Sequence, residues 1–161
     1  MRNTAGNWFT LSAMVILLDQ ASKLWINAHF VYGEQLPVVN MFSLILAHNP
    51  GAAFSFLSNA GGLQRWLFTG IAVIASLWMI ALLRKHANET LFALALSLVL
   101  GGALGNLIDR VLYGYVIDFL LFYWHDYSFP AFNLADSAIT LGAGLLLLDS
   151  FKKDKHGTAT R

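Results

Sequence analysis

Four long apolar stretches constrain this sequence more than any other feature. They are residues 8–30, 66–83, 91–108 and 132–151. In a helix that rises 1.5 Å per residue, about 20 residues cross a hydrocarbon core of roughly 30 Å. Only 12% of the residues are charged, whereas about a quarter are charged in an average soluble domain. The sequence therefore predicts an all-α polytopic membrane protein, with four transmembrane helices in one domain over residues 1–161.

The first stretch also has the basic start and apolar run of a cleaved signal peptide. However, Asp19 and Lys23 interrupt it, no small-residue cleavage site follows, and three more apolar stretches come later. We therefore expect residues 8–30 to remain as the first transmembrane helix.

Basic residues indicate how these helices are oriented. The N-terminus, the loop between the second and third stretches, and the C-terminal tail contain Arg2, Arg84, Lys85, Lys152, Lys153, Lys155 and Arg161. The other two loops, 31–65 and 109–131, carry a basic residue only at an edge, Arg65 and Arg110. By the positive-inside rule, both termini are predicted to be cytoplasmic and these two loops to face outward.

The first outer loop contains signals for a small β platform. Residues 41–48 have strand-like content, and Asn49-Pro50-Gly51 is a strong turn signal. Residues 52–57 then resume the strand-like pattern. We expect a β-hairpin on the outer leaflet, followed by a flexible return over residues 58–62. The hairpin could hold a peptide or a lipid, and a surface flap without a binding role remains the alternative.

The second outer loop is rich in aromatic residues. Residues 111–131 include four Tyr, three Phe and one Trp before Pro130 closes the segment. Such a composition is typical of a segment that lies in the headgroup layer, and we expect an aromatic outer loop here.

Two carboxylates are predicted to meet at the outer surface. The third helix runs outward, Asp118 follows it, and Asp136 lies in the first turn of the fourth helix. Two acids at one membrane interface could share a site, and a close pair holds one proton because both carboxyls cannot ionise comfortably. The ionised member would then take a proton from water, and the protonated member would support a substrate carbonyl oxygen.

Other polar residues in the same window could support this pair. Asn106 and Asn133 could orient the carboxylates or the substrate backbone, and Arg110 could balance charge. Local structure offers other interpretations: Asn133 and Asp136 have the spacing of a helix N-cap pair, Asp109 and Arg110 could form a surface charge pair, and Asp118 could be solvated.

Two further features of the helices favour structural roles. Asp19 and Lys23 are four residues apart, which favours an intramembrane ion pair. Gly101 and Gly105 form a small-xxx-small pair of the kind that lets helices pack closely.

Several kinds of chemistry are absent from the sequence. There is no Cys, so disulfides and thiolate chemistry are excluded. His48 and His125 belong to no H-E-x-x-H pattern, so no metal site is expected. G-x-S-x-G motifs, phosphate-binding loops and basic patches for nucleic acid are also missing, and we expect neither a cofactor nor a nucleic-acid partner.

The polar motifs, taken together, resemble those of one known family. In chain order they are Asp19-Gln20-x-x-Lys23, Asn49-x-Gly51-Ala52-Ala53-Phe54-Ser55, Gly105-Asn106-x-x-Asp109-Arg110, Val116-x-Asp118-Phe119 and Phe132-Asn133-x-Ala135-Asp136. The chain resembles the lipoprotein signal peptidase (signal peptidase II) family of bacterial aspartic membrane endopeptidases over nearly its whole length.

This resemblance implies that Asp118 and Asp136 are the catalytic dyad. The supporting or substrate-binding positions that it implies are Asn106, Arg110, Asn133, Asn49, Gly51, Asp19, Lys23, Asp109 and Ala135. It also implies a prolipoprotein substrate, cut just before a Cys that carries diacylglyceryl, and inhibition by globomycin. The expected location is the bacterial inner membrane among its lipids, with a periplasmic site, no metal and a monomeric state.

Two other functions remain as alternatives at this point. A small proton-coupled transporter or channel subunit could use Asp19, Lys23, Asp109 and Asp136 as a relay. The sequence lacks the repeats typical of transporters, and its acids gather at one face. A lipid- or peptide-binding scaffold would leave the carboxylate pair unexplained.

Overall fold

Four long helices make up most of the molecule. The computed structural model describes residues 5–51 and 63–157. Its helices are α1 (Ala5–His29), α2 (Leu63–Lys85), α3 (Thr90–Leu112) and α4 (Leu134–Gly157). Each of the four is long and apolar enough to cross a membrane, as the sequence predicts.

The ends of two helices differ from the predicted bounds in ways that matter for the site. α3 continues to Leu112 instead of ending at residue 108, so Asp109 and Arg110 lie within the helix and not in a loop. α4 begins at Leu134 instead of residue 132, because the side chain of Asn133 caps its first turn.

A four-stranded antiparallel sheet lies at one end of the helices. It contains β1 (Gln35–Val39), β2 (Phe42–Asn49), β3 (Val116–Trp124) and β4 (Tyr127–Ser128), in the order β1-β2-β3-β4. Pro37 lies in β1, an edge strand, where a missing backbone N–H is tolerated. The sheet therefore combines strands from both connecting loops, and the aromatic loop is largely a strand and not only a surface segment.

The first strand of the predicted hairpin is confirmed as β2, but its partners β1 and β3 were not predicted. The turn after β1 lies at Asn40 and Met41, where Met41 has a positive φ of 68°, and β2 pairs with β1 on one side and β3 on the other. The turn signal at residues 49–51 follows the end of β2. The predicted second strand, 52–57, and the return, 58–62, lie outside the described residues.

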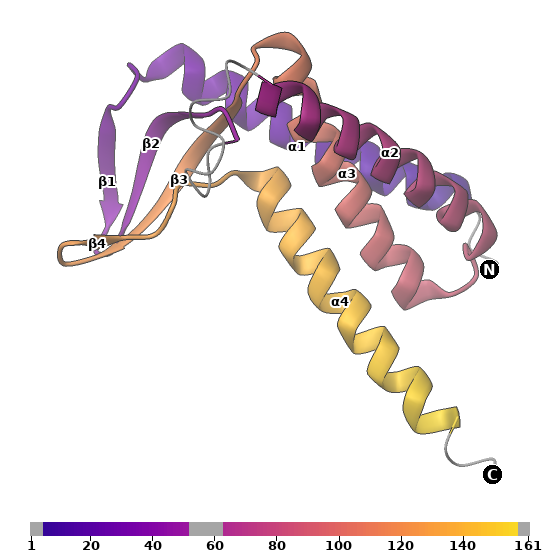
Figure 1. Ribbon diagram of the computed structural model, residues 1–161. Helices are drawn as coiled ribbons and strands as arrows, with labels where there is room; N and C mark the ends of the chain where they lie inside the picture. Colours follow the sequence, from indigo (N-terminus) through magenta and orange to yellow (C-terminus); the bar gives the residue numbers. More distant parts are fainter. Residues whose placement is uncertain (1–4, 52–62, 158–161) are drawn as a thin grey trace.

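α3 is the central helix. It packs against α1, α2 and α4, whereas no Cα atom in the described part of α2 lies within 8 Å of one in α4. Gly101 and Gly105 both face α1, next to Val15 and Asp19 respectively, in agreement with the predicted close packing. Figure 1 shows α4 diverging from α2 along its length.

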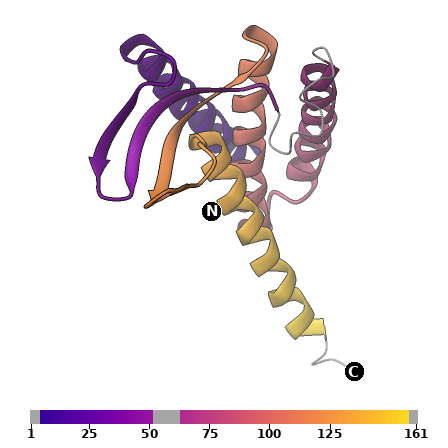
Figure 2. The same cartoon turned by 60° about the vertical axis from the view of Figure 1, so that its left-hand side comes forward.

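The sheet is joined to the helices by an apolar cluster. Ile26 near the end of α1 packs with Leu46, Ile117 and Phe119 from the two central strands. The start of α1, the α2–α3 connection and the end of α4 lie away from the sheet, and Figure 2 shows the sheet curving over the other end of the helices. The junction between sheet and helices is where the polar residues of the sequence meet.

Candidate active site

The structure brings Asp118 and Asp136 into one polar site. Asp118 lies on β3, and Asp136 lies in the first turn of α4. Asn133 connects them, since its amide nitrogen donates to Asp118 Oδ1 at 2.7 Å and its amide oxygen accepts from the backbone N–H of Asp136 at 2.9 Å. The side-chain amide of Asn133 thus holds the carboxyl group of Asp118 at one end and the backbone of Asp136 at the other.

Asp118 is almost completely buried, with 2% of its surface exposed. Its second oxygen, Oδ2, accepts a hydrogen bond of 3.0 Å from the amide nitrogen of Asn49. Burial, and secondarily the charge of Asp136, raises the pKa of Asp118 from 3.8 to about 7, although the bonds from Asn49 and Asn133 act in the opposite direction. Asp118 is therefore not an ordinary solvated acid but a group suited to carry a proton near neutral pH.

Asp136 is held by amide donors on both of its carboxyl oxygens. Asn106 Nδ2 donates to Oδ1 at 2.7 Å, and the backbone N–H of Asn133 donates to Oδ2 at 3.3 Å. With the reciprocal bond from the Asp136 N–H to Asn133, this is the capping pair that the spacing predicts. Capping and site geometry therefore use the same residues and are not competing interpretations.

Asn49 and Gly51 form the edge of the site beside Asp118. The oxygen of Asn49 accepts the backbone N–H of Gly51 at 2.9 Å, which directs the amide nitrogen of Asn49 toward Asp118. Gly51 has a φ of +92°, and an added Cβ would lie 2.7 Å from the ring of Phe68. A glycine is needed here for both its conformation and its lack of a side chain.

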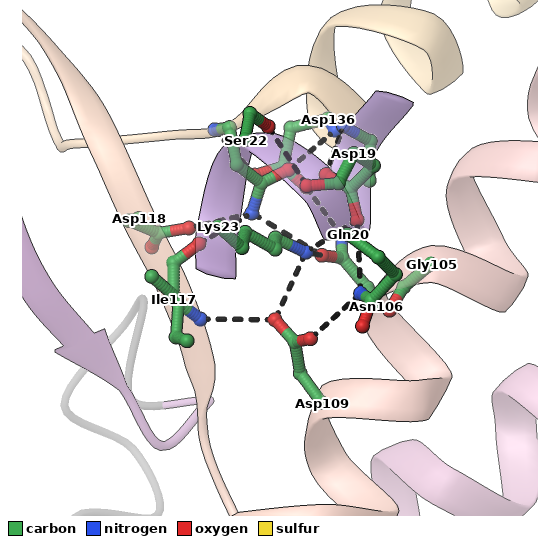
Figure 3. A network of polar contacts seen from close by, with 12 residues as sticks. Asp19, Gln20, Ser22, Lys23, Gly105, Asn106, Asp109, Ile117, Asp118 and Asp136 are labelled. Carbon is green, nitrogen blue, oxygen red and sulfur yellow. Dashed lines mark hydrogen bonds and ion pairs between the residues drawn. The ribbon is translucent and has the colours of Figure 1, made fainter. Parts of the chain in front are cut away.

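A buried ionic network lies directly beside the two carboxyl groups. Lys23 Nζ lies 2.8 Å from Asp19 Oδ2 and 2.9 Å from Asp109 Oδ2. The Asp19–Lys23 pair is the one that the sequence predicts. Asp109, in contrast, pairs with Lys23 and not with its neighbour Arg110, and Figure 3 shows the three charged groups converging.

Arg110 makes few hydrogen bonds with the part of the chain that the structure describes. The one hydrogen bond found for it among the described residues is long, 3.4 Å from Nη1 to the backbone oxygen of Asn106. Its guanidinium carbon lies 5.7 Å from the centre of the Phe68 ring. Arg110 also lines the cavity described next, together with Asn106 and Asp136, so a ligand in that cavity could contact its guanidinium.

Two cavities meet at Asp136. One, of about 470 Å³, runs between α2, α3 and α4, from Arg110 at its polar end to Leu96 and Leu146 in the apolar region. The other, of about 530 Å³, lies on another face of α4 and is lined by Phe129, Phe132, Ser137, Thr140 and Leu141 as well as Asp136. Both cavities are largely apolar, so the carboxylate is accessible from two lipid-like environments.

Residues outside the predicted set also shape the site. Gln20 Nε2 donates to Asp109 Oδ1 at 2.8 Å, and the Arg65 guanidinium donates to the backbone oxygens of Arg110 and Val111 at 2.8 and 2.7 Å. Gln20 belongs to the motif Asp19-Gln20-x-x-Lys23, but no role was predicted for it. Nothing local to Arg65 indicates that it caps a helix 45 residues away. The described residues contain no group of three or more acids and histidines arranged to hold a metal.

Comparisons with known proteins agree over nearly the whole chain. Residues 11–152 match the family described as "Signal peptidase (SPase) II". A lipoprotein signal peptidase of Ralstonia nicotianae is 52% identical over 92% of this chain and 86% of that protein, and one of Burkholderia vietnamiensis is 54% identical over 91% and 88%. A solved structure described as a bacterial membrane enzyme has a TM-score of 0.85 at 30% identity, covering 97% of this chain and 95% of that one.

Proposed function

The chain belongs to the lipoprotein signal peptidase (signal peptidase II) family, and from that membership we propose that Asp118 and Asp136 are its catalytic dyad. Its function is the removal of signal peptides from prolipoproteins. The observation that carries the proposal is that Asn133 donates to both carboxyl groups, with its side-chain amide to Asp118 and with its backbone N–H to Asp136. The relatives give no support to the transporter alternative.

In the proposed mechanism, the dyad hydrolyses the peptide bond without a covalent intermediate. We assign the shared proton to Asp118, whose pKa is about 7, and the role of general base to Asp136. A water molecule attacks the scissile carbonyl carbon while Asp136 takes one of its protons. Asp118 donates a hydrogen bond to the carbonyl oxygen, and collapse of the tetrahedral intermediate releases the amine with a proton from the dyad.

The cavity between α2 and α4 is suited to the signal peptide. It extends along α3 from Arg110 to Leu96, which is about 21 Å of helix at 1.5 Å per residue. This length covers most of a hydrocarbon core, and the space exists because the backbones of α2 and α4 are more than 8 Å apart. The signal peptide helix would lie there with its cleavage end at the dyad.

The second cavity gives the lipid part of the substrate a separate place. In a Cys that carries diacylglyceryl, the apolar acyl chains and the peptide chain are attached to the same residue. The cavity lined by Phe132, Thr140 and Leu141 opens from Asp136 on another face of α4. We therefore place the acyl chains there and the cut just before the lipidated Cys.

The proposed orientation puts the dyad on the periplasmic side of the inner membrane. Arg84 and Lys85 end α2 at the side away from the sheet, and positive residues favour the cytoplasmic side. The sheet, with Asp118 on β3, and the first turn of α4, with Asp136, lie at the opposite end of the helices (Figure 1). There the sheet would lie next to the outer leaflet, where lipidated substrate is present. We also propose that the enzyme is a monomer and that globomycin competes with the substrate for this site.

Cleavage of a diacylglyceryl-modified prolipoprotein by the purified protein in detergent tests this proposal. We expect wild-type cleavage, and a loss of at least about 100-fold in Asp118→Asn and Asp136→Asn, because each variant removes one member of the acid–base pair. Asp126→Asn is the matched control, since Asp126 is an exposed acid between β3 and β4. A folded variant of either dyad position that keeps a tenth of wild-type activity contradicts the dyad.

EDTA should have no effect, and loss of activity that a divalent metal restores would contradict the metal-free mechanism.

A further inference from the structure

The ammonium group of Lys23 uses all of its hydrogen-bond donors, although it contacts neither of the proposed catalytic carboxyl groups. Only 1% of its surface is exposed. Its ammonium lies 2.8 Å from Asp19 Oδ2, 2.9 Å from Asp109 Oδ2 and 2.9 Å from Asn106 Oδ1. An ammonium has three N–H donors, and here each has one acceptor. Figure 3 shows Lys23 at the centre of this network, between α1 and α3.

Each acid bound to Lys23 holds the backbone directly before one catalytic residue. Asp19 Oδ1 accepts the N–H of Ala135 at 2.9 Å, and Ala135 precedes Asp136. Asp109 Oδ2 accepts the N–H of Ile117 at 3.1 Å, and Ile117 precedes Asp118. Two acids on different helices thus fix the two dyad residues at the level of the main chain.

The third contact of Lys23 sets the orientation of an amide. Asn106 Oδ1 accepts from Lys23 and, at 3.2 Å, from Asn133 Nδ2, while Asn106 Nδ2 donates to Asp136 Oδ1 at 2.7 Å. A flipped amide would place its NH₂ group against these two donors and its oxygen against the carboxylate of Asp136. Lys23 therefore keeps the N–H of Asn106 directed at Asp136.

We propose that Lys23 is a positioning residue for the dyad: through Asp19, Asp109 and Asn106 it fixes the relative placement of Asp118 and Asp136. This inference rests on the proposed catalytic role of those two residues. A purely structural ion pair would hold α1 against α3 and would affect stability alone. A positioning residue also affects the chemical step, because reacting groups displaced by about 1 Å lose on the order of 100-fold in rate.

The test measures stability and kinetics of the full-length protein with a lipidated prolipoprotein. For Lys23→Met we expect kcat to fall between about tenfold and 100-fold, while KM changes less than about twofold because the cavities are intact. The alkaline limb of the pH profile should move to higher pH, because the charge of Lys23 lowers the pKa of Asp118. Among the described residues, Asp19 of α1 and Asp109 of α3 form ion pairs with Lys23. Asp118 of β3 also feels its charge, and the other charges that act on Asp118 are those of Asp136 on α4 and Arg110 on α3.

A matched control separates positioning from helix packing. Ser12 also joins α1 to α3, with its hydroxyl donating to the backbone oxygen of Ser97 at 2.9 Å, but it has no contact with the dyad. Ser12→Ala should lower the Tm and leave kcat and the pH profile unchanged. Lys23→Met with a lowered Tm but a wild-type kcat and pH profile would overturn the inference.

A second variant covers the case in which Lys23→Met does not fold. Replacing Lys23 alone leaves two buried carboxylates unpaired. The triple variant Asp19→Asn/Lys23→Met/Asp109→Asn removes all three charges, and its new amide oxygens can still accept the N–H groups of Ala135 and Ile117. We expect the same loss of kcat, and wild-type kcat in this variant overturns the inference. Inactive wild-type protein would instead contradict the proposed function itself, so the two failures are distinguishable.

Discussion

Asn133 Nδ2 lies 2.7 Å from Asp118 Oδ1, and the Asn133 side chain is completely buried. Its oxygen is occupied by the backbone N–H of Asp136, so the amide cannot rotate without breaking both contacts. One residue therefore caps α4 and sets the direction from which Asp118 receives a hydrogen bond. These two roles make different demands on the side chain, and they can be separated by substitution.

We expect Asn133→Ser to keep the cap and lose the contact with Asp118. Serine is as good an N-cap as asparagine, but it is too short to reach a second carboxylate. The kcat should fall by up to about tenfold, since a hydrogen bond to the protonated carboxyl group of Asp118 contributes roughly 0.5–1.5 kcal/mol, while the Tm stays near that of the wild type. Asn133→Ala, which loses both contacts, should lower the kcat and the Tm. Kinetic assays and thermal melts in detergent measure the two effects, and a wild-type kcat in Asn133→Ser would show that the contact is dispensable.

The raised pKa of Asp118 predicts how activity depends on pH. The shared proton is lost as pH rises through the pKa of about 7, so kcat/KM should fall about tenfold per pH unit on the alkaline side. Asn49→Ala should move this limb to higher pH, because the hydrogen bond from Asn49 lowers the pKa of Asp118. Activity that stays constant from about pH 6 to about pH 9, a range of roughly three pH units, would contradict the assignment of the proton to Asp118.

The same shift predicts a pH dependence of stability. Between pH 3.8 and about 7 folded Asp118 holds a proton that the unfolded chain has released. The free energy of unfolding therefore decreases as pH rises through this window. Above the window, the stability that this bound proton contributes has been lost. Comparing the melting temperature of wild type and Asp118→Asn across the window isolates this contribution, because asparagine does not titrate. Equal slopes in the two proteins would show that Asp118 makes no such contribution.

Local spacing in the sequence predicts the parts of the site that neighbouring residues build. Asp19 and Lys23 are four apart on one helix and form an ion pair, and Asn133 and Asp136 are three apart and form a cap. The partners of Asp109 were not predictable in this way. Lys23 lies on a different helix, and Asp109 faces it only because α1 packs on the glycines of α3.

The pairing of the strands also could not be predicted from local spacing in the sequence. The strong turn signal at residues 49–51 suggested a hairpin, yet its first residue, Asn49, is used to contact Asp118. β2 pairs with β3, whose residues lie about 70 positions further along, as in the Ala47–Asp118 pair. Pairing over this distance is decided by the packing of Ile26, Leu46 and Ile117 beneath the sheet, which no local pattern in the loop encodes.

Filling the cavity between α2 and α4 should block the substrate and leave the dyad intact. Ala72 of α2 lines this cavity, so Ala72→Trp should raise KM by about tenfold or more, with a smaller effect on kcat. Ala81→Trp is the matched control, since Ala81 is an exposed residue of the same helix and does not line the cavity. Steady-state kinetics with a lipidated prolipoprotein gives both parameters. An unchanged KM in Ala72→Trp would place the signal peptide elsewhere.

Gly102 is predicted to be the least replaceable contact between α3 and α4. A Cβ at this position would collide with the backbone oxygen of Ala135 and lie 2.8 Å from Ile139 Cγ1. The backbone oxygen cannot move without shifting Asp136, the next residue. Gly102→Ala should therefore destabilise the protein by roughly 1–3 kcal/mol, as overpacking does, and should lower kcat in the molecules that remain folded. Gly144→Ala on α4, where an added Cβ meets no atom within 4 Å, should instead be neutral or stabilising by up to about 1 kcal/mol. Thermal melts and kcat of the two variants provide the comparison, and a Gly102→Ala protein as stable and active as Gly144→Ala would show that α4 can shift without disturbing the dyad.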